Sequence, residues 1–173
     1  MNSDRLSRLQ LPLPGVRPLV PESRKSRVRR SPIMHKRILG VLREASGGAR
    51  DVAEIYRQEV LPIKTRTIQL LGRKYPARII NTLLGFEVQA SYKRVPCPDL
   101  ITARYLKVFT ELGCRSIKLP YDITITDRIV PELELAMNRL AAGVRGLFPE
   151  DRSLQLYVLR KTCAHLRAQL QSQ

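Results

Sequence analysis

The chain has 173 residues, which suffice for one domain with a hydrophobic core but are too few for two domains of ordinary size. Its 31 Lys and Arg residues exceed its 15 Asp and Glu residues, so the formal net charge is +16 and polyanions are the expected ligands. The sequence has no apolar run of about 20 residues and no apolar secretory signal, so we expect a cytoplasmic protein with no membrane contact.

Two parts of the chain carry nearly all of the positive charge. Residues 1–32 have a net charge of +6 and residues 61–118 a net charge of +8, whereas the two remaining segments have +1 each. A solvated surface tolerates such charge, but its concentration in two blocks favours a located binding surface over a uniformly cationic one.

Residues 1–31 are expected to form a disordered basic tail, and residues 32–173 a single globular domain. Five prolines interrupt residues 1–32 and oppose the amphipathic helix of an organelle-targeting peptide, so organelle targeting is the minor alternative. The tail ends in an arginine-rich run, and segments of this kind fold on RNA in many RNA-associated proteins.

Helical spacing of apolar residues recurs twice in the first part of the domain. Ser31 and Pro32 mark the start of a helix over residues 32–46, which ends at a pair of glycines. The same spacing predicts a second, shorter helix over residues 50–60.

The next segment is ambiguous between helix and strand. Threonines favour a strand over residues 65–71, while Ile68 and Leu71 fit a helix, which is the weakly preferred interpretation. A further helix is predicted over residues 76–84, with Gly85 as its left-handed cap. Two such helices would form a helix-turn-helix, a DNA-binding motif, although the second is short and mostly apolar.

Alternation of apolar and polar residues predicts one strand from Phe86 to Val95. A helix follows over residues 99–112, because apolar residues recur at helical spacing until Gly113. A second strand is predicted over residues 115–121, and a strand, a helix and a strand joined so closely resemble a parallel crossover unit.

Two amphipathic helices are predicted at the C-terminal end. Pro131, followed by Glu132 and Glu134, marks the start of the first helix, which ends at Phe148. Residues 127–170 then form a nearly neutral antiparallel hairpin, which serves as a scaffold or as a homodimer interface. The expected fold is a mainly helical α+β domain with a two- or three-stranded sheet, a βαβ-like unit and this hairpin.

No pattern in the sequence supports catalysis, so we expect a protein that is not an enzyme and uses no cofactor or metal. Glycine-rich phosphate-binding motifs are absent, and the three cysteines, read as reduced thiols, lack the spacing of a zinc site. Cys97 precedes a predicted helix, whose N-terminus lowers the pKa of a nearby thiol. The carboxylate pairs, such as Glu132 and Glu134, fit helix starts better than acid–base catalysis.

A basic surface that binds a nucleic acid is the leading functional hypothesis, with RNA slightly preferred over DNA and a regulatory or ribonucleoprotein-associated role. Tyr75 is the tyrosine expected to be free for base stacking, since Tyr92 and Tyr105 fit the core better. The alternative is an adaptor or inhibitor that binds an acidic protein, such as a nucleic-acid-processing enzyme. The residues expected to contact nucleic acid are Arg24, Lys25, Arg27, Arg29, Arg30, Arg66, Arg73, Lys74, Tyr75, Arg78, Lys93, Arg94, Arg104 and Lys107.

Overall fold

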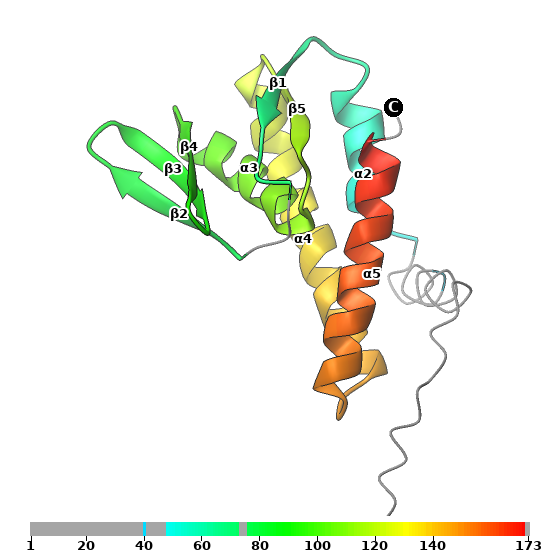
Figure 1. Ribbon diagram of the computed structural model, residues 1–173. Coiled ribbons are helices and arrows are strands. Elements are labelled where there is room, and N and C mark those ends of the chain that lie inside the picture. Colours follow the sequence, from blue (N-terminus) through cyan, green and yellow to red (C-terminus); the bar gives the residue numbers. More distant parts are fainter. Residues whose placement is uncertain (1–39, 41–47, 73–75, 172–173) are drawn as a thin grey trace, which may run out of the picture. The chain divides into compact units, whose positions relative to one another are not determined.

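The fold is mainly helical α+β, as the sequence predicts, and the described residues form two small antiparallel sheets and a helix pair at the C-terminal end (Figure 1). The computed structural model describes residue 40, residues 48–72 and residues 76–171. The predicted tail and the helix predicted over residues 32–46 therefore lie outside the described residues, except for Gly40. None of the described helices has the length and apolar composition that crossing a membrane requires.

The first described helix, α2 (Val52–Ile55), continues directly into a π-helical turn, η1 (Tyr56–Val60), which confirms the helix predicted over residues 50–60. Asp51 begins α2 with a capping box. Its side chain accepts a hydrogen bond from the Glu54 N–H at 2.8 Å, and the Glu54 carboxylate accepts one from the Asp51 N–H at 3.1 Å.

The smaller sheet consists of β1 (Thr65–Gln69) and β5 (Ser116–Pro120), which pair in antiparallel fashion. The weakly preferred helix over residues 65–71 is therefore wrong, because its β-branched residues suit a pleated strand and β5 supplies the hydrogen-bonding partner. β5 itself confirms the strand predicted over residues 115–121.

The larger sheet has the order β2 (Ala77–Thr82), β3 (Gly85–Ala90) and β4 (Lys93–Cys97). The helix predicted over residues 76–84 is wrong. These residues include several β-branched side chains, and they form a strand and the tip of a hairpin. Gly85 has φ of 121° as part of that hairpin rather than as a helix cap. With both proposed helices replaced by strands, the predicted helix-turn-helix is wrong as well.

The alternation predicted from Phe86 to Val95 holds within β3 and then stops at a turn formed by Ser91 and Tyr92. One continuous strand is therefore the wrong prediction, because the turn, in which Ser91 has φ of 55°, returns the chain beside β3 as β4. The parallel crossover unit is also wrong. β4 and β5 belong to different sheets, and each pairing in the two sheets is antiparallel.

The long helix α3 (Leu100–Leu112) confirms the helix predicted over residues 99–112. Asp99 caps it by accepting a hydrogen bond from the Thr102 N–H at 2.7 Å. Gly113 ends it in the left-handed conformation, with φ of 83°.

The C-terminal helices are α4 (Ile123–Leu147) and α5 (Arg152–Gln171). α4 begins before Pro131, because Asp122 accepts a hydrogen bond from the Thr124 N–H at 2.9 Å. The predicted start after Pro131 is wrong, since this residue lies inside the helix, where it removes one backbone donor without ending the helix. α5 runs back beside α4, which confirms the predicted helix pair (Figure 1).

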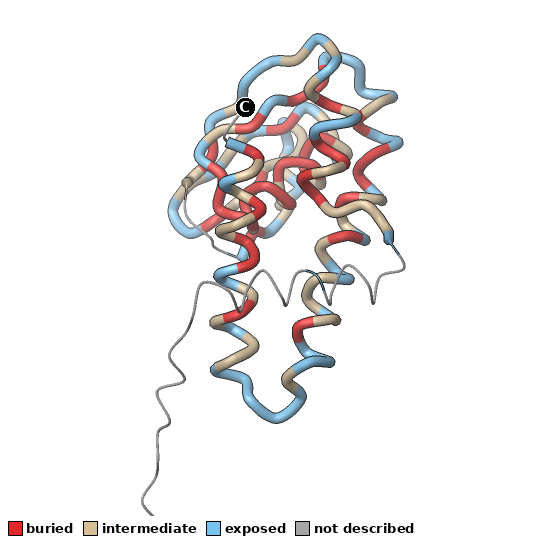
Figure 2. The backbone as a smooth tube through the Cα atoms, turned by 90° about the vertical axis from the view of Figure 1, so that its right-hand side faces the viewer, coloured by how far each residue is buried: buried red, intermediate tan, exposed pale blue. Residues whose placement is uncertain are grey.

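The core lies where α3 contacts the three-stranded sheet on one side and α4 and α5 on the other (Figure 1). Figure 2 shows buried residues gathered in this region, while the loop between α4 and α5 is mostly exposed. The ring of Phe109, fully buried on α3, contacts the rings of Tyr105 and Tyr56 with centroid distances of 4.8 and 5.5 Å. Tyr105 thus belongs to the core, as predicted.

Two tyrosine hydroxyls hold the backbone of Lys118 in β5. The Tyr105 hydroxyl donates to the Lys118 carbonyl oxygen at 2.7 Å, and the Lys118 N–H donates to the Tyr56 hydroxyl at 3.1 Å. Lys118 lies opposite Thr67, at a position in the register where its N–H and carbonyl point away from β1. Burial raises the pKa of Tyr105 well above its ordinary value, so its hydroxyl stays protonated and able to donate.

We expect Tyr105→Phe to lower the free energy of unfolding by about 1–3 kcal/mol, because the partly buried hydrogen bond to the Lys118 carbonyl then loses its donor. Urea denaturation followed by circular dichroism measures the change. As a control, Tyr92→Phe removes a hydroxyl from an exposed side chain and should change stability by less than about 0.5 kcal/mol. Equal losses in the two variants would contradict a structural role for this hydrogen bond.

Candidate nucleic-acid interface

The three-stranded sheet has an apolar inner face and a polar outer face. Val88, which is 1% exposed, lies in the middle of the inner face, against α3. Because side chains alternate along a strand, the outer face carries Arg78, Gln89 and Arg94, which lie side by side across β2, β3 and β4. Neighbouring strands are about 4.8 Å apart, so the backbones of the two arginines are separated by about 10 Å.

Both arginines of this row are exposed, and one of them has an acidic neighbour. The Nη1 atom of Arg94 lies 3.6 Å from Oε2 of Glu87, and the Arg94 side chain is 60% exposed. This distance is too long for a hydrogen bond, and Oε2 of Glu87 has no hydrogen-bond partner among the described residues. Arg94 therefore offsets the charge of Glu87 and keeps guanidinium N–H groups for a second anion.

Tyr92 stands at the turn between β3 and β4, at the end of the sheet nearest to the arginine row. Its side chain is 86% exposed, so the expectation that it belongs to the core is wrong. The reason is the turn itself, which takes the chain out of the alternating pattern at Ser91. An exposed tyrosine near arginines offers a ring face on which an unpaired base stacks.

The two predicted cations on α3 form ion pairs with carboxylates. Arg104 donates from Nε and Nη2 to both carboxylate oxygens of Glu134 in α4, with an Nε distance of 3.0 Å. Lys107 lies 3.9 Å from Glu111, one turn further along α3. Arg104 therefore joins α3 to α4, and neither residue lies on the sheet.

The remaining predicted residues are divided among other parts of the chain. Nζ of Lys93 donates to the Leu70 carbonyl at 3.0 Å and so links β4 to the segment after β1. Arg66 is exposed on β1, in the other sheet. The residues outside the described ranges are Arg24, Lys25, Arg27, Arg29, Arg30, Arg73, Lys74 and Tyr75. The structure thus brings Arg78 and Arg94 together and adds Gln89 and Tyr92, which sequence reasoning missed.

Cys97 and Cys114 do not have the lowered pKa that a nucleophilic thiol requires. Burial raises the pKa of Cys97 to about 11, so its position just before α3 does not make it a reactive thiolate. Burial also raises the pKa of Cys114 to about 12, and Cys163 is buried as well. Within residues 48–72 and 76–171, no group of three His, Cys, Asp or Glu residues is placed to hold a metal ion.

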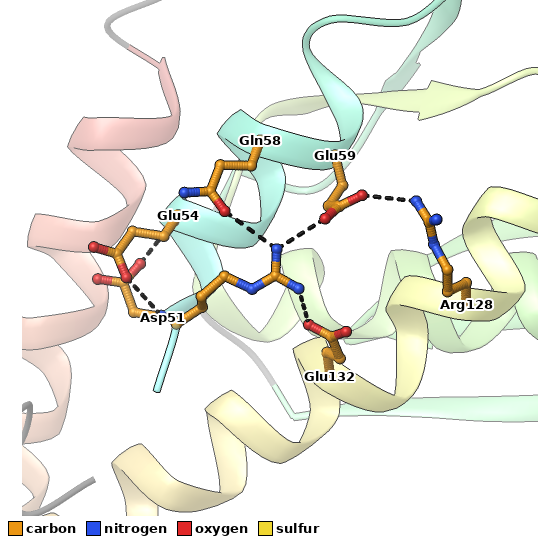
Figure 3. A network of polar contacts seen from close by, with 7 residues as sticks. Asp51, Glu54, Gln58, Glu59, Arg128 and Glu132 are labelled. Atoms are coloured by element: carbon orange, nitrogen blue, oxygen red, sulfur yellow. Dashed lines mark hydrogen bonds and ion pairs between the residues drawn. The ribbon is translucent and has the colours of Figure 1, made fainter. Parts of the chain in front are cut away.

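Glu132 and Glu134 lie inside α4, so their assignment to a helix start is wrong, and both bind arginines instead. Glu132 belongs to a network that joins the α2–η1 segment to α4 (Figure 3). Arg50 donates to Glu132 and, at 2.8 Å, to Glu59. Arg128 donates to the second oxygen of Glu59 at 2.7 Å. The hydrogen bond from Arg50 lowers the pKa of Glu59.

Glu59→Gln should lower the free energy of unfolding by less than about 1 kcal/mol at neutral pH, a magnitude typical of ion pairs near the surface. Because the folded-state pKa of Glu59 is lowered, its contribution is complete above about pH 5 and is lost as the pH falls through that pKa. The stability difference between wild type and variant should therefore shrink between about pH 5 and pH 3.

Urea denaturation at several pH values measures this difference. Glu150→Gln, in the exposed loop between α4 and α5, is the matched control and should leave stability unchanged across the range. If the free energies of unfolding of wild type and Glu59→Gln differ by a constant amount down to about pH 3, the lowered pKa of Glu59 contributes nothing to stability.

Known proteins provide no guide to this surface. Comparisons with protein families, with curated protein sequences and with solved structures found no match. The functional assignment therefore depends on the geometry of the sheet and on its charges.

Proposed function

We propose that the protein binds single-stranded nucleic acid, with RNA preferred over DNA, through the outer face of the sheet β2-β3-β4. The observation that carries this proposal is the cross-strand row of Arg78, Gln89 and Arg94, with Tyr92 exposed at the adjacent turn. Guanidinium groups bind phosphates, an amide reads a base edge, and a tyrosine ring stacks on a base. In the cell, the role would be that of a regulatory or ribonucleoprotein-associated protein.

The net charge of the chain supports a polyanionic ligand. A formal charge of +16 creates a long-range field that attracts nucleic acid and raises its local concentration at the surface. Within the block of residues 61–118, two carboxylates hold Lys107 and Arg104 in ion pairs, whereas Arg78 has no ion pair among the described residues. Arg78 and Arg94 are thus the cations of this face that are best placed to bind phosphate.

Two features favour a single strand over a duplex. The segment that would have formed a groove-reading helix is a strand and a hairpin tip, so the described part of residues 64–84 offers no such helix. The exposed ring of Tyr92 stacks only on a base that is free of its own pairing partner. RNA presents such bases in loops and at ends, which is where most sequence-specific RNA recognition occurs.

Arg78→Ala and Arg94→Ala should each weaken binding to a single-stranded RNA oligonucleotide. If each arginine neutralises one phosphate, the slope of log K against log salt becomes shallower by about 0.7 per substitution. Fluorescence anisotropy titrations between about 50 and 200 mM salt measure the slope. Arg139→Ala removes an exposed cation from α4, away from the sheet, and should leave the slope unchanged. Unchanged slopes in all three variants would exclude this face as the binding site.

Tyr92→Ala should weaken RNA binding by about fivefold to a hundredfold, which corresponds to the loss of one base stack of roughly 1–3 kcal/mol. Tyr92→Phe keeps the ring and should bind like the wild type. The same titrations, at fixed salt, give the two affinities. Wild-type affinity in the alanine variant would contradict stacking, and an equal loss of affinity in both variants would assign the contact to the hydroxyl instead of the ring.

A further inference from the structure

A lysine lies against an exposed tyrosine at one end of the smaller sheet. Lys64 precedes β1 and Tyr121 follows β5, and the Tyr121 N–H donates to the Lys64 carbonyl at 3.2 Å. The Nζ atom of Lys64 lies 5.6 Å from the centroid of the Tyr121 ring, which is within the range of a cation–π interaction. Tyr121 is 61% exposed, so the lysine orients the ring without covering it.

Arg66 adds a second cation to this pair. It lies two residues after Lys64, and therefore on the same face of β1, and it is exposed. Its partner in the strand register is Leu119. Tyr121 is thus its diagonal neighbour across the two strands, at a separation of about 7–8 Å that long side chains span. We refer to Lys64, Arg66 and Tyr121 as the Tyr121 cluster.

The cations of the Tyr121 cluster have no carboxylate partner in the described part of the chain. Neither Lys64 nor Arg66 belongs to any of the ion pairs found there. The carboxylate nearest along the chain is that of Asp122. It accepts hydrogen bonds from the N–H and the hydroxyl of Thr124, at 2.9 and 2.7 Å, and so caps α4. Both positive charges therefore stay available to an external anion.

The Tyr121 cluster lies apart from the arginine row of the larger sheet. Lys93, next to Tyr92, donates to the carbonyl of Leu70, so the Tyr92 turn lies near the end of β1. Lys64 lies just before the other end of β1, and the six residues of extended chain between it and Leu70 span about 20 Å. Figure 1 shows β1 and β5 between the larger sheet and α2. The cluster is therefore a second place at which cations and an exposed ring occur together.

Cations beside an exposed ring match the two chemical parts of a nucleotide, its phosphate and its base. Inorganic phosphate engages the cations only, and an acidic peptide likewise gives the ring no base to stack on. A base inside a duplex is covered by its neighbours and presents no face to the ring. The Tyr121 cluster therefore fits single-stranded nucleic acid better than these other anions.

We propose that Lys64, Arg66 and Tyr121 form a second binding site for single-stranded nucleic acid, so that one chain holds two segments of nucleic acid at once. Lys64 and Arg66 bind phosphates, and a base stacks on the ring of Tyr121. The inference rests on the proposed function for the class of ligand, and it extends that function from binding one segment to joining two. Such a protein brings together distant parts of one strand, or two separate strands.

Calorimetric titration of the full-length protein with a single-stranded RNA of about four nucleotides counts the sites, because so short a strand fills one site only. The wild type should bind one oligonucleotide more than Tyr121→Ala, and one more than the triple variant Arg78→Ala/Tyr92→Ala/Arg94→Ala. Tyr121→Phe keeps the ring and should bind as many as the wild type. The backbone bond from Tyr121 to Lys64 does not use the side chain, so the alanine variant should fold normally, which circular dichroism checks.

The cations of the second site are tested in the triple variant, which lacks the first site. There, Lys64→Ala and Arg66→Ala should each make the slope of log K against log salt shallower by about 0.7. Lys161→Ala is the matched control. Its Nζ lies 5.9 Å from the centroid of the Tyr157 ring on α5, so this substitution removes a pair of the same kind elsewhere and should leave the slope unchanged.

The possible outcomes separate the second site from the first. Equal binding by the wild type and Tyr121→Ala, with loss in the triple variant, would overturn the second site and leave the proposed function standing. Loss in Tyr121→Ala alone would support the second site and overturn the proposed binding face. A wild type that binds no oligonucleotide at about 50 mM salt would overturn both.

Discussion

The peptide group of Lys118 is the point at which three distant parts of the chain are fixed to one another. Tyr56 from η1 and Tyr105 from α3 bind its N–H and its carbonyl, so aromatic residues that fill the core also satisfy the free edge of β5. β5 in turn fixes the position of β1, because the two strands pair with one another. The Leu70 carbonyl, in the segment after β1, accepts a hydrogen bond from Lys93 in β4. The three-stranded sheet, which carries the candidate site, is thereby fixed in position relative to α3 and β5.

The sequence predicted those elements whose ends are marked by local chemistry, such as α3, with its capping aspartate and terminal glycine. It failed where long-range pairing decides between helix and strand, as in β1 and β2, whose apolar spacing fits both. One usable signal was overlooked. Apolar residues occupy even positions from Phe86 to Ala90 and odd positions at Val95 and Cys97, and a two-residue turn produces this change of phase.

The candidate site was predictable only as a charged segment and not as a set of side chains. Which cations remain available depends on carboxylates that the sequence places far away, as Arg104 and Glu134 show across 30 positions. Arg78 and Arg94 come together because the strand register aligns both with Gln89. The exposure of Tyr92 follows from the turn that the alternating pattern concealed. Charge composition indicates a class of ligand, while register selects the residues that meet it.

The enclosure of all three native cysteines makes the molecule well suited to site-directed labelling. Maleimide reagents react with the thiolate form of cysteine. Cys97 and Cys114 have pKa values raised to about 11 and 12, so little thiolate is present at neutral pH. Cys163 is shielded by burial. A cysteine introduced at position 92 or at position 83 would react far faster than these. Spectroscopic probes can thus be attached at either end of the three-stranded sheet while the core keeps its native residues.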